Sequence, residues 1–244
     1  MTLQIEEHDD RVVATLDRPD KRNAIDQETI DALHALCAAL EEHPRVLILT
    51  GSEGVFAAGA DIAQLRERTA EDARRGINAM AFIRINELPM PVIAAMDGWA
   101  LGGGAELAYA ADIRIGTPAL RIGNPETGLG IMAAAGATWR LPEIVGAARA
   151  SELLLTGRIL TAEEALSWGL VSALYPPADL LDAAHELADR IAAADDLATR
   201  HTKRALRAPR AQHPAVELAL QAELFESPEK QRRMTEFLEK RSRR

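Results

Sequence analysis

Glu106 is the residue whose surroundings point most directly to chemistry. It lies in residues 101–111, a run otherwise made of glycine, alanine, leucine and tyrosine. A carboxylate in such apolar surroundings is costly unless it has a partner or a role, and burial there raises its pKa. On a helix, the residues three and four positions away are glycine, tyrosine and alanine, which supply no cation. A solvated helix face is the alternative, and we favour a functional carboxylate over it.

Two loops could present backbone N–H groups to a developing negative charge. Residues 56–61 lie between a strand pattern and a helix start, and the glycine run 102–104 precedes the helix that contains Glu106. Amides at a helix N-terminus suit an oxygen that gains charge, such as the carbonyl of a thioester becoming an enolate. Both segments could equally be tight strand-to-helix turns in which glycine relieves crowding.

A second glutamate, Glu126, has a simpler local explanation. The sequence Asn124-Pro125-Glu126-Thr127 is typical of a helix start, with an N-cap asparagine, a proline at the first helical position and an acidic first turn. From this pattern alone, Glu126 would be a capping residue.

Alternating strand and helix patterns must position these residues. Strands are expected at 11–17, 45–50, 92–96, 112–117 and 120–123, with a last candidate at 170–175. Helices are expected at 27–42, 70–87, 106–111, 135–146 and 147–156. Only helical patterns follow, so we predict an α/β core over residues 1–176 and a helical region over 177–244. Such a helical region often packs subunits together.

Composition limits the class of protein. The 244 residues are 48% hydrophobic, which allows a sizeable core, and the net charge of -9 disfavours nucleic acid and anionic membranes as partners. The longest apolar stretch is interrupted by Asp97 and Glu106, and the first ten residues are acidic, so neither a membrane span nor a secretory signal is expected. The single cysteine, Cys37, predicts a buried inert thiol and a cytoplasmic location.

Several common site motifs are absent from the sequence. There is no Gly-x-Ser-x-Gly, His-Glu-x-x-His, Cys-x-x-Cys or P-loop pattern, and no metal site is expected. A dinucleotide fingerprint fails because its third glycine position is Leu107. A nucleic-acid surface is also disfavoured, because the arginines at 66, 68, 74 and 75 are interleaved with acids at 67, 71 and 72.

Taken together, these residues resemble the crotonase, or enoyl-CoA hydratase/isomerase, family. Residues 57–62 resemble its first oxyanion segment, 91–112 its central signature and 123–130 its second glutamate loop. Further matches occur at 17–19, 22–24, 155–157, 162–171 and 237–241, so the resemblance covers almost the whole chain.

The resemblance implies a fold and a site. The fold is a spiral of ββα units, followed by a helical region that builds trimers, commonly paired into hexamers. The oxyanion donors would be the N–H groups of Ala60 and Gly103. Glutamates stand twenty residues apart in hydratases of this family, as Glu106 and Glu126 do here. By resemblance, Glu106 activates water and Glu126 carries the proton exchanged at the α-carbon.

The same resemblance implies where coenzyme A binds. Its phosphates would be met near Arg22 and Ala24 and by Lys240 of the C-terminal helix, often from a neighbouring subunit. The pantetheine arm would lie along the first loop and touch mainly main chain, at Ala58, Ala60, Asp61 and Ile62. No separate cofactor is implied, because coenzyme A is part of the substrate.

The implied activity is reversible hydration of a 2-enoyl-CoA in fatty-acid or related catabolism, by a hydro-lyase. One departure from the family bears on the water: Ala134 occupies a glycine position whose N–H helps to hold the catalytic water in hydratases. The added methyl group restricts positive φ and could change the fit of water or acyl chain. Alternatives are a Δ3,Δ2-enoyl-CoA isomerase of the same family and an acyl-CoA-binding protein without turnover.

Overall fold

The structure is a computed structural model that describes residues 2–242. The chain divides into two compact units, Met1–Ala188 and Asp189–Arg244. The division falls inside helix α9 (Leu180–Ala192), because the first part of this helix packs on the larger unit. There, Arg11 Nη1 donates to the His185 carbonyl oxygen at 2.7 Å. The compact units therefore divide later in the chain than residue 176, where we expect the helical region to begin.

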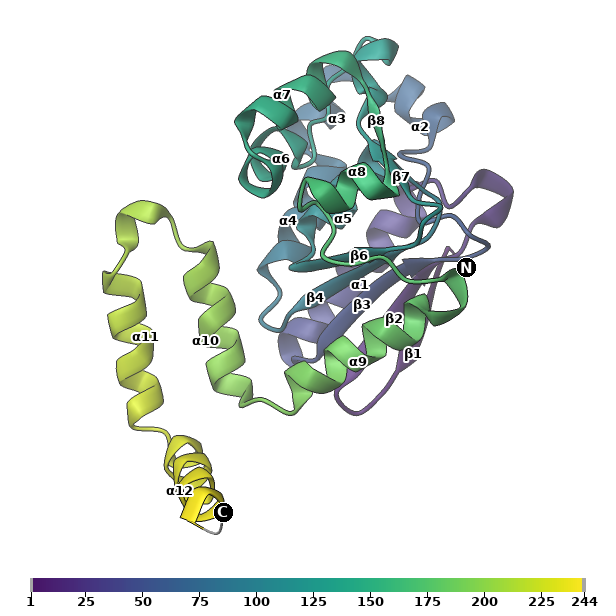
Figure 1. Ribbon diagram of the computed structural model, residues 1–244. Coiled ribbons are helices and arrows are strands. Elements are labelled where there is room, and N and C mark those ends of the chain that lie inside the picture. Colours follow the sequence, from purple (N-terminus) through teal and green to yellow (C-terminus); the bar gives the residue numbers. More distant parts are fainter. Residues whose placement is uncertain (1, 243–244) are drawn as a thin grey trace. The chain divides into compact units, whose positions relative to one another are not determined.

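The main sheet of the larger unit has five strands in the order β1-β2-β3-β4-β6. The strands are β1 (Leu3–Glu7), β2 (Arg11–Leu16), β3 (Val46–Gly51), β4 (Val92–Met96) and β6 (Ile113–Gly116). Only β1 runs antiparallel to its neighbour, and the other pairs are parallel. Figure 1 shows these strands side by side. The residues of β4 are buried throughout, as expected for a covered parallel strand.

A second, smaller sheet holds the strand that leads into the glycine run. It consists of β5 (Trp99–Leu101), β7 (Arg121–Gly123) and β8 (Ile159–Thr161), with β7 in the centre. Because β5 and β7 are parallel and paired at Leu101 and Gly123, the segments after them, which carry Glu106 and Glu126, start side by side.

Helices cover the sheets and present the loops. Helix α1 (Gln27–Glu42) begins as predicted, because the Asp26 side chain accepts from the Thr29 N–H. It packs against α4 (Ile77–Glu87), which packs in turn against α5 (Gly103–Ala110). The remaining helical elements of this unit are α2 (Ile62–Glu67), α3 (Ala70–Arg75), α6 (Ala137–Val145), α7 (Ala147–Thr156), α8 (Ala162–Ser167) and the 3-10 turns η1 (Pro19–Lys21), η2 (Pro125–Leu129) and η3 (Pro177–Asp179).

Two predictions of secondary structure were wrong. The helix expected at 70–87 is broken at Gly76, whose φ of 63° ends α3 and starts α4. The strand expected at 170–175 does not form, because only Leu174 makes a bridge, to Gly116, the last residue of β6. Short apolar segments are ambiguous when their partner strand is unknown.

The smaller unit is helical throughout its described residues, as predicted. It contains α10 (Asp196–Arg207), η4 (Arg210–Gln212), α11 (Ala215–Phe225) and α12 (Pro228–Ser242). Helices α10 and α11 run side by side (Figure 1), joined by a contact of 2.8 Å between His201 Nε2 and Glu223 Oε2. None of the described helices combines the length and the apolar character needed to cross a membrane.

Candidate active site

A cavity of about 560 Å³ in the larger unit gathers most of the predicted site residues. Its wall contains predicted site residues from the first loop (residues 56–61) and the start of α2, from the glycine run and α5, and from η2 and the loop after it. These residues are Ala58, Ala60, Ile62, Gly103, Glu106, Glu126 and Ala134. Three segments far apart in the sequence, residues 58–62, 103–106 and 126–134, therefore meet at one place, as the chemistry proposed for them requires.

The amides of Ala60 and Gly103 lie close together in this cavity wall. The Ile25 N–H donates to Gly59 O at 2.8 Å and the Asp61 N–H to Ile25 O at 2.9 Å, so the intervening Ala60 N–H points to the opposite side. Gly103 is the first residue of α5, and a helix offers its first N–H groups no internal partner. A methyl group built on Gly103 would lie 3.5 Å from the Ala60 nitrogen, so the two donors are close.

Glycine is required in this run by close backbone contacts. A methyl group on Gly104 would lie 2.3 Å from the Ala57 carbonyl oxygen, so α5 can approach the first loop only with glycine at this position. Gly102 has a φ of 51°, and a methyl group there would lie 3.1 Å from Glu126 Oε1. The glycine run therefore forms a tight turn, and Gly103 opens α5 directly after Gly102.

The Glu106 carboxylate lies inside the protein and is held by backbone amides. Only 3% of the surface of Glu106 is exposed. Oε1 accepts from the Ala135 N–H at 2.7 Å and from the Ala137 N–H at 3.1 Å. The pKa of Glu106 is raised to about 7. Burial is the main cause and the charge of Glu126 adds to it, whereas the two hydrogen bonds and Arg140 lower the pKa. This matches the rise expected from the apolar run.

The Glu126 carboxylate is buried near the same cavity but has fewer partners. It lies in the first turn of η2, at 9% exposure, where Oε1 accepts from Asn124 Nδ2 at 3.3 Å. Its other oxygen, Oε2, is buried and has no hydrogen-bond partner within the described part of the chain. Burial raises the pKa of Glu126 against the hydrogen bond from Asn124. An unpartnered carboxyl oxygen facing a cavity is available to a ligand.

Asn124 does not cap the turn in the way that the sequence suggests. It stands at the N-cap position before Pro125, but its side chain makes no capping hydrogen bond. Instead, its Oδ1 accepts from the Tyr109 hydroxyl at 3.0 Å, and its Nδ2 donates to Gly102 O and Glu126 Oε1, each at 3.3 Å. The buried phenol therefore sets the orientation of the amide that holds Glu126. Sequence reasoning missed this role, although a tyrosine in an apolar helix signals a need for a polar partner.

The residue predicted to place water, Ala134, lines the cavity and is exposed to it. The amides that donate to Glu106 come from the next turn, at Ala135 and Ala137, and were not predicted. The segment after η2 thus bears on the site through backbone groups that no sequence pattern identified.

Several residues expected to meet coenzyme A support the first loop from outside the cavity. The Arg22 carbonyl oxygen accepts from the Ala58 N–H at 3.0 Å, and Arg18 Nη1 donates to the Ala24 carbonyl oxygen at 2.6 Å. Asp61 caps α2 and forms an ion pair of 3.2 Å with Arg18. Lys240 is exposed on α12 of the smaller unit.

The arrangement suits proton transfer beside a polarised carbonyl. Two neighbouring N–H groups can stabilise an oxyanion, and two carboxyl groups that both have raised pKa values can donate and accept protons. Within residues 2–242 there is no cluster of three or more side chains suited to a metal ion.

Comparisons with known proteins agree with this geometry. The family model for enoyl-CoA hydratase/isomerase matches residues 8–244. The short-chain-enoyl-CoA hydratase of Clostridium acetobutylicum is 38% identical over 94% of this chain and 91% of its own length. The crotonyl-CoA hydratase of Syntrophomonas wolfei is 36% identical over 97% of this chain and 95% of its own length.

A solved structure gives the same result for the fold. The crystal structure of an enoyl-CoA hydratase from Bacillus anthracis superposes with a TM-score of 0.93 at 31% identity, covering 98% of this chain and 97% of that one. The predicted crotonase-like fold, α/β with C-terminal helices, is thereby confirmed. By sequence, fold and the match of its family model, the chain belongs to the enoyl-CoA hydratase/isomerase family.

Proposed function

We propose that this protein is an enoyl-CoA hydratase, which adds water reversibly across the 2,3 double bond of a 2-enoyl-CoA. The observation that carries the proposal is the placement of two buried carboxyl groups, Glu106 and Glu126, in the cavity wall that also holds the free amides of Ala60 and Gly103. The names of the hydratase relatives support the same reaction.

In the proposed reaction, the thioester oxygen accepts hydrogen bonds from the Ala60 and Gly103 amides. Water attacks C3 while electrons move from the double bond towards that oxygen, and the amides stabilise the charge that accumulates there. Loss of one such donor typically costs about 100-fold or more in rate. Protonation at C2 then restores the thioester carbonyl.

The two carboxyl groups divide the proton transfers. Glu106, as carboxylate, accepts the proton that the attacking water loses, and Glu126, as carboxylic acid, donates the proton that C2 gains. The net change is one hydroxyl at C3 and one hydrogen at C2, and the extra proton on Glu106 returns to Glu126 before the next turnover. The two amide donors on Glu106 oppose the effect of burial, so that with a pKa of about 7 part of Glu106 is ionised at neutral pH, whereas the unpartnered Oε2 of Glu126 can carry a proton.

The direct test incubates the purified protein with crotonyl-CoA and with a longer 2-enoyl-CoA, followed by mass analysis. A gain of one water in either product supports the proposal. No hydration of either, with conversion of a 3-enoyl-CoA to its 2-enoyl isomer, would establish the isomerase instead. Binding of both thioesters without conversion would establish a non-catalytic acyl-CoA-binding protein.

Separate Glu106→Gln and Glu126→Gln variants test the division of labour. Hydration should collapse in both, because each carboxyl group carries one proton transfer that a carboxamide cannot perform. Glu87→Gln, at the exposed end of α4, is the matched control and should keep full activity. Full hydration by either site variant would contradict the two-carboxylate scheme.

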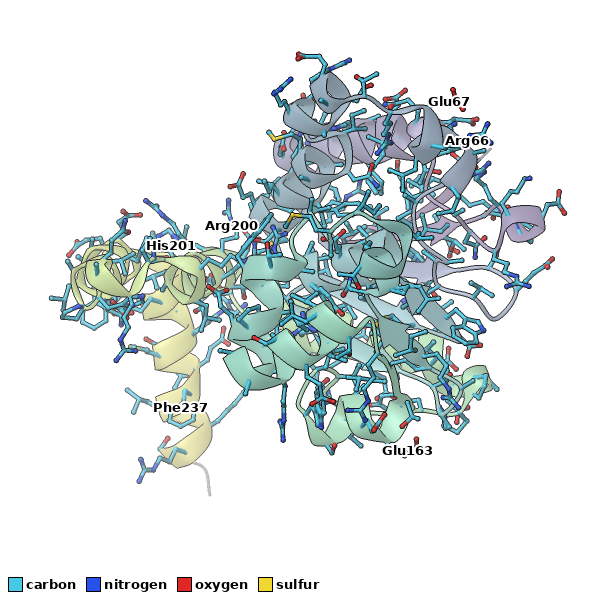
Figure 2. The ribbon with its side chains drawn as sticks, turned by 90° about the horizontal axis from the view of Figure 1, so that it is seen from above. Arg66, Glu67, Glu163, Arg200, His201 and Phe237 are labelled. Atoms are coloured by element: carbon cyan, nitrogen blue, oxygen red, sulfur yellow. The ribbon has the colours of Figure 1, made fainter. Side chains whose placement is uncertain are left out.

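The proposal includes assembly into trimers or dimers of trimers through the smaller unit. Large apolar side chains more than half exposed lie on its helices: Leu206, Leu218, Phe225, Met234, Phe237 and Leu238. Phe237, for example, projects from α12 (Figure 2). Such side chains are expected to be covered by another subunit. Light scattering after size exclusion should give three or six times the chain mass of 26.4 kDa, and a monomer would refute assembly.

Coenzyme A binding by Lys240 and the loop of Arg22 and Ala24 is part of the same proposal. Lys240→Met should raise KM by a similar factor for every acyl-CoA, because the lysine would meet phosphate rather than acyl chain. An unchanged KM for all substrates would remove Lys240 from the site.

A further inference from the structure

Four arginines lie close together in the sequence after the first loop, and one of them behaves differently from the rest. Arg66 pairs with Glu67 at 2.9 Å, Arg74 with Glu71 at 3.5 Å and Arg75 with Asp72 at 3.6 Å. Arg66 and Glu67 project from the surface of α2 (Figure 2). The fourth, Arg68, lines the cavity, and no carboxylate within residues 2–242 lies at ion-pair distance from its guanidinium.

The Arg68 guanidinium is held in place inside a mostly apolar wall. Its Nη1 donates to Asn78 Oδ1 at 2.9 Å, and Asn78 is buried. The same cavity wall includes the apolar side chains of Leu65, Ile77 and Met132. Desolvation by this environment lowers the pKa of Arg68, and attraction to Asp72 opposes the change.

Asp72 does not neutralise this charge. It also lines the cavity, but its Oδ2 accepts from the Thr69 N–H and hydroxyl, both at 2.9 Å, and its Oδ1 pairs with Arg75. Arginine carries several N–H donors in a planar fork, and among residues 2–242 only Asn78 accepts a hydrogen bond from Arg68. The remaining donors can therefore take a planar anion by two parallel hydrogen bonds.

Asn78 also places this charge relative to the reaction centre. A methyl group built on Gly103 would lie 3.6 Å from Asn78 Nδ2. Thus one amide group links the oxyanion donor Gly103 to the guanidinium of Arg68. An anion bound by Arg68 would lie a few bonds from the thioester carbonyl, whereas the phosphates of coenzyme A are separated from it by the whole pantetheine arm.

We propose that Arg68 binds a carboxylate carried by the acyl chain, so that the preferred substrates are short 2-enoyl-CoA thioesters of dicarboxylic acids. The kinetic test of this inference rests on the proposed hydratase function. Asn78 is the positioning residue that fixes the guanidinium. A purely hydrocarbon chain in the same place would leave the charge of Arg68 partly desolvated and without a counter-ion, which is unfavourable.

The kinetic test compares two substrates of matched shape. Glutaconyl-CoA ends in a carboxylate, and 5-methylhex-2-enoyl-CoA carries an isopropyl group of the same outline in its place. The native protein should show a kcat/KM at least about tenfold higher for glutaconyl-CoA. Arg68→Met should lower this value about 100-fold for glutaconyl-CoA, a range typical of a lost charged hydrogen-bonded pair, while the isopropyl analogue and crotonyl-CoA change less than about threefold.

Arg66→Met is the matched control, since it makes the same substitution at an exposed arginine two residues away. It should leave the preference unchanged. An equal loss for all three substrates in Arg68→Met would show that Arg68 meets coenzyme A phosphate, and would overturn the assignment. Equal use of both matched substrates by the native protein would overturn it as well.

A binding measurement separates this inference from the proposed function. Calorimetry with glutaryl-CoA and 5-methylhexanoyl-CoA, which lack the double bond, requires no turnover. Preferential binding of glutaryl-CoA that disappears in Arg68→Met supports the assignment even if no hydration is found. Lack of preference in the native protein refutes it even if crotonyl-CoA is hydrated. Arg68→Lys, which keeps the charge without the planar fork, should retain part of the preference and guards against misfolding of the methionine variant.

Discussion

The raised pKa of Glu106 has a consequence for stability that a single substitution can reveal. The pKa rises from 4.5 to about 7 in the folded protein, so the folded state binds more protons than the unfolded state between these two values. The free energy of unfolding must therefore fall as the pH rises through this window. Each pKa unit corresponds to about 1.4 kcal/mol, so the ionised carboxylate lowers stability by about 3 kcal/mol above pH 7.

Glu106→Gln removes this cost and should keep the local hydrogen bonds. The amide oxygen of glutamine can accept from the Ala135 and Ala137 N–H groups as the carboxylate does. We expect the variant to be more stable than the native protein by about 3 kcal/mol at pH 8.5 and by a few tenths of a kcal/mol at pH 4.5. Hydratase activity should be lost at both pH values, as a trade between stability and function predicts.

Urea unfolding at the two pH values, at one protein concentration, measures the difference in free energy of unfolding between variant and native protein. The difference follows from the shift in the urea concentration at the midpoint, provided that the dependence of the free energy on urea is unchanged. Glu87→Gln, at an exposed position, should change stability by less than about 0.5 kcal/mol at either pH. A variant less stable than the native protein at pH 8.5, or a gain of equal size at both pH values, would refute the electrostatic explanation.

Three further outcomes follow from contacts in the same unit. Tyr109→Phe removes the hydrogen bond that orients the Asn124 amide and should lower kcat about tenfold with little change in KM, as measured by steady-state kinetics. Tyr175→Phe, at the other tyrosine, is the control and should change neither kcat nor KM. Gly104→Ala should lower the free energy of unfolding by about 2 kcal/mol or more, measured by heat or urea, because its methyl group would clash with the Ala57 carbonyl oxygen. Gly128→Ala places its methyl group in open space and should change this free energy by less than about 0.5 kcal/mol. Cys37 is buried and its pKa is raised to about 12, mainly by burial, so iodoacetamide at pH 8 should label it in urea but not in the native protein.

Local signals predicted those parts of the fold whose determinants lie close in sequence. Helix α1 could be placed because Asp26 caps it and its apolar residues recur with helical spacing. The break of the later helix at Gly76 was not predicted, since a glycine within a helical pattern does not reveal its own φ. The segment 170–175 was wrongly predicted as a strand, because its apolar character did not show that its backbone hydrogen bonds to β6 would form only a single bridge, at Leu174.

The site shows the same division between local and distant causes. Glu106 could be singled out because one charged residue stands in an apolar run. The local pattern did not single out Glu126, because its own turn explains it, and only the twenty-residue spacing of the family resemblance pointed to it. The pairing of β5 with β7 is what brings it beside Gly102. In the sequence, Arg68 looked like one member of a mixed-charge surface. Two features of the structure distinguish it: no carboxylate among the described residues pairs with it, and its guanidinium donates to Asn78, ten residues further along the chain.

The hold on Glu106 by the N–H groups of Ala135 and Ala137 also bears on how this site can change during evolution. A main-chain donor is supplied by every residue type except proline. Substitutions in residues 133–137 can therefore alter the lining of the cavity while the carboxylate keeps its two hydrogen bonds, provided that the local backbone path is preserved. The alanines at 133–135 and 137 are therefore neutral with respect to these two hydrogen bonds. Side chains at 133–135 and 137 can thus change while the Glu106 carboxylate keeps its place, whereas Gly136, with a φ of 139°, must remain glycine.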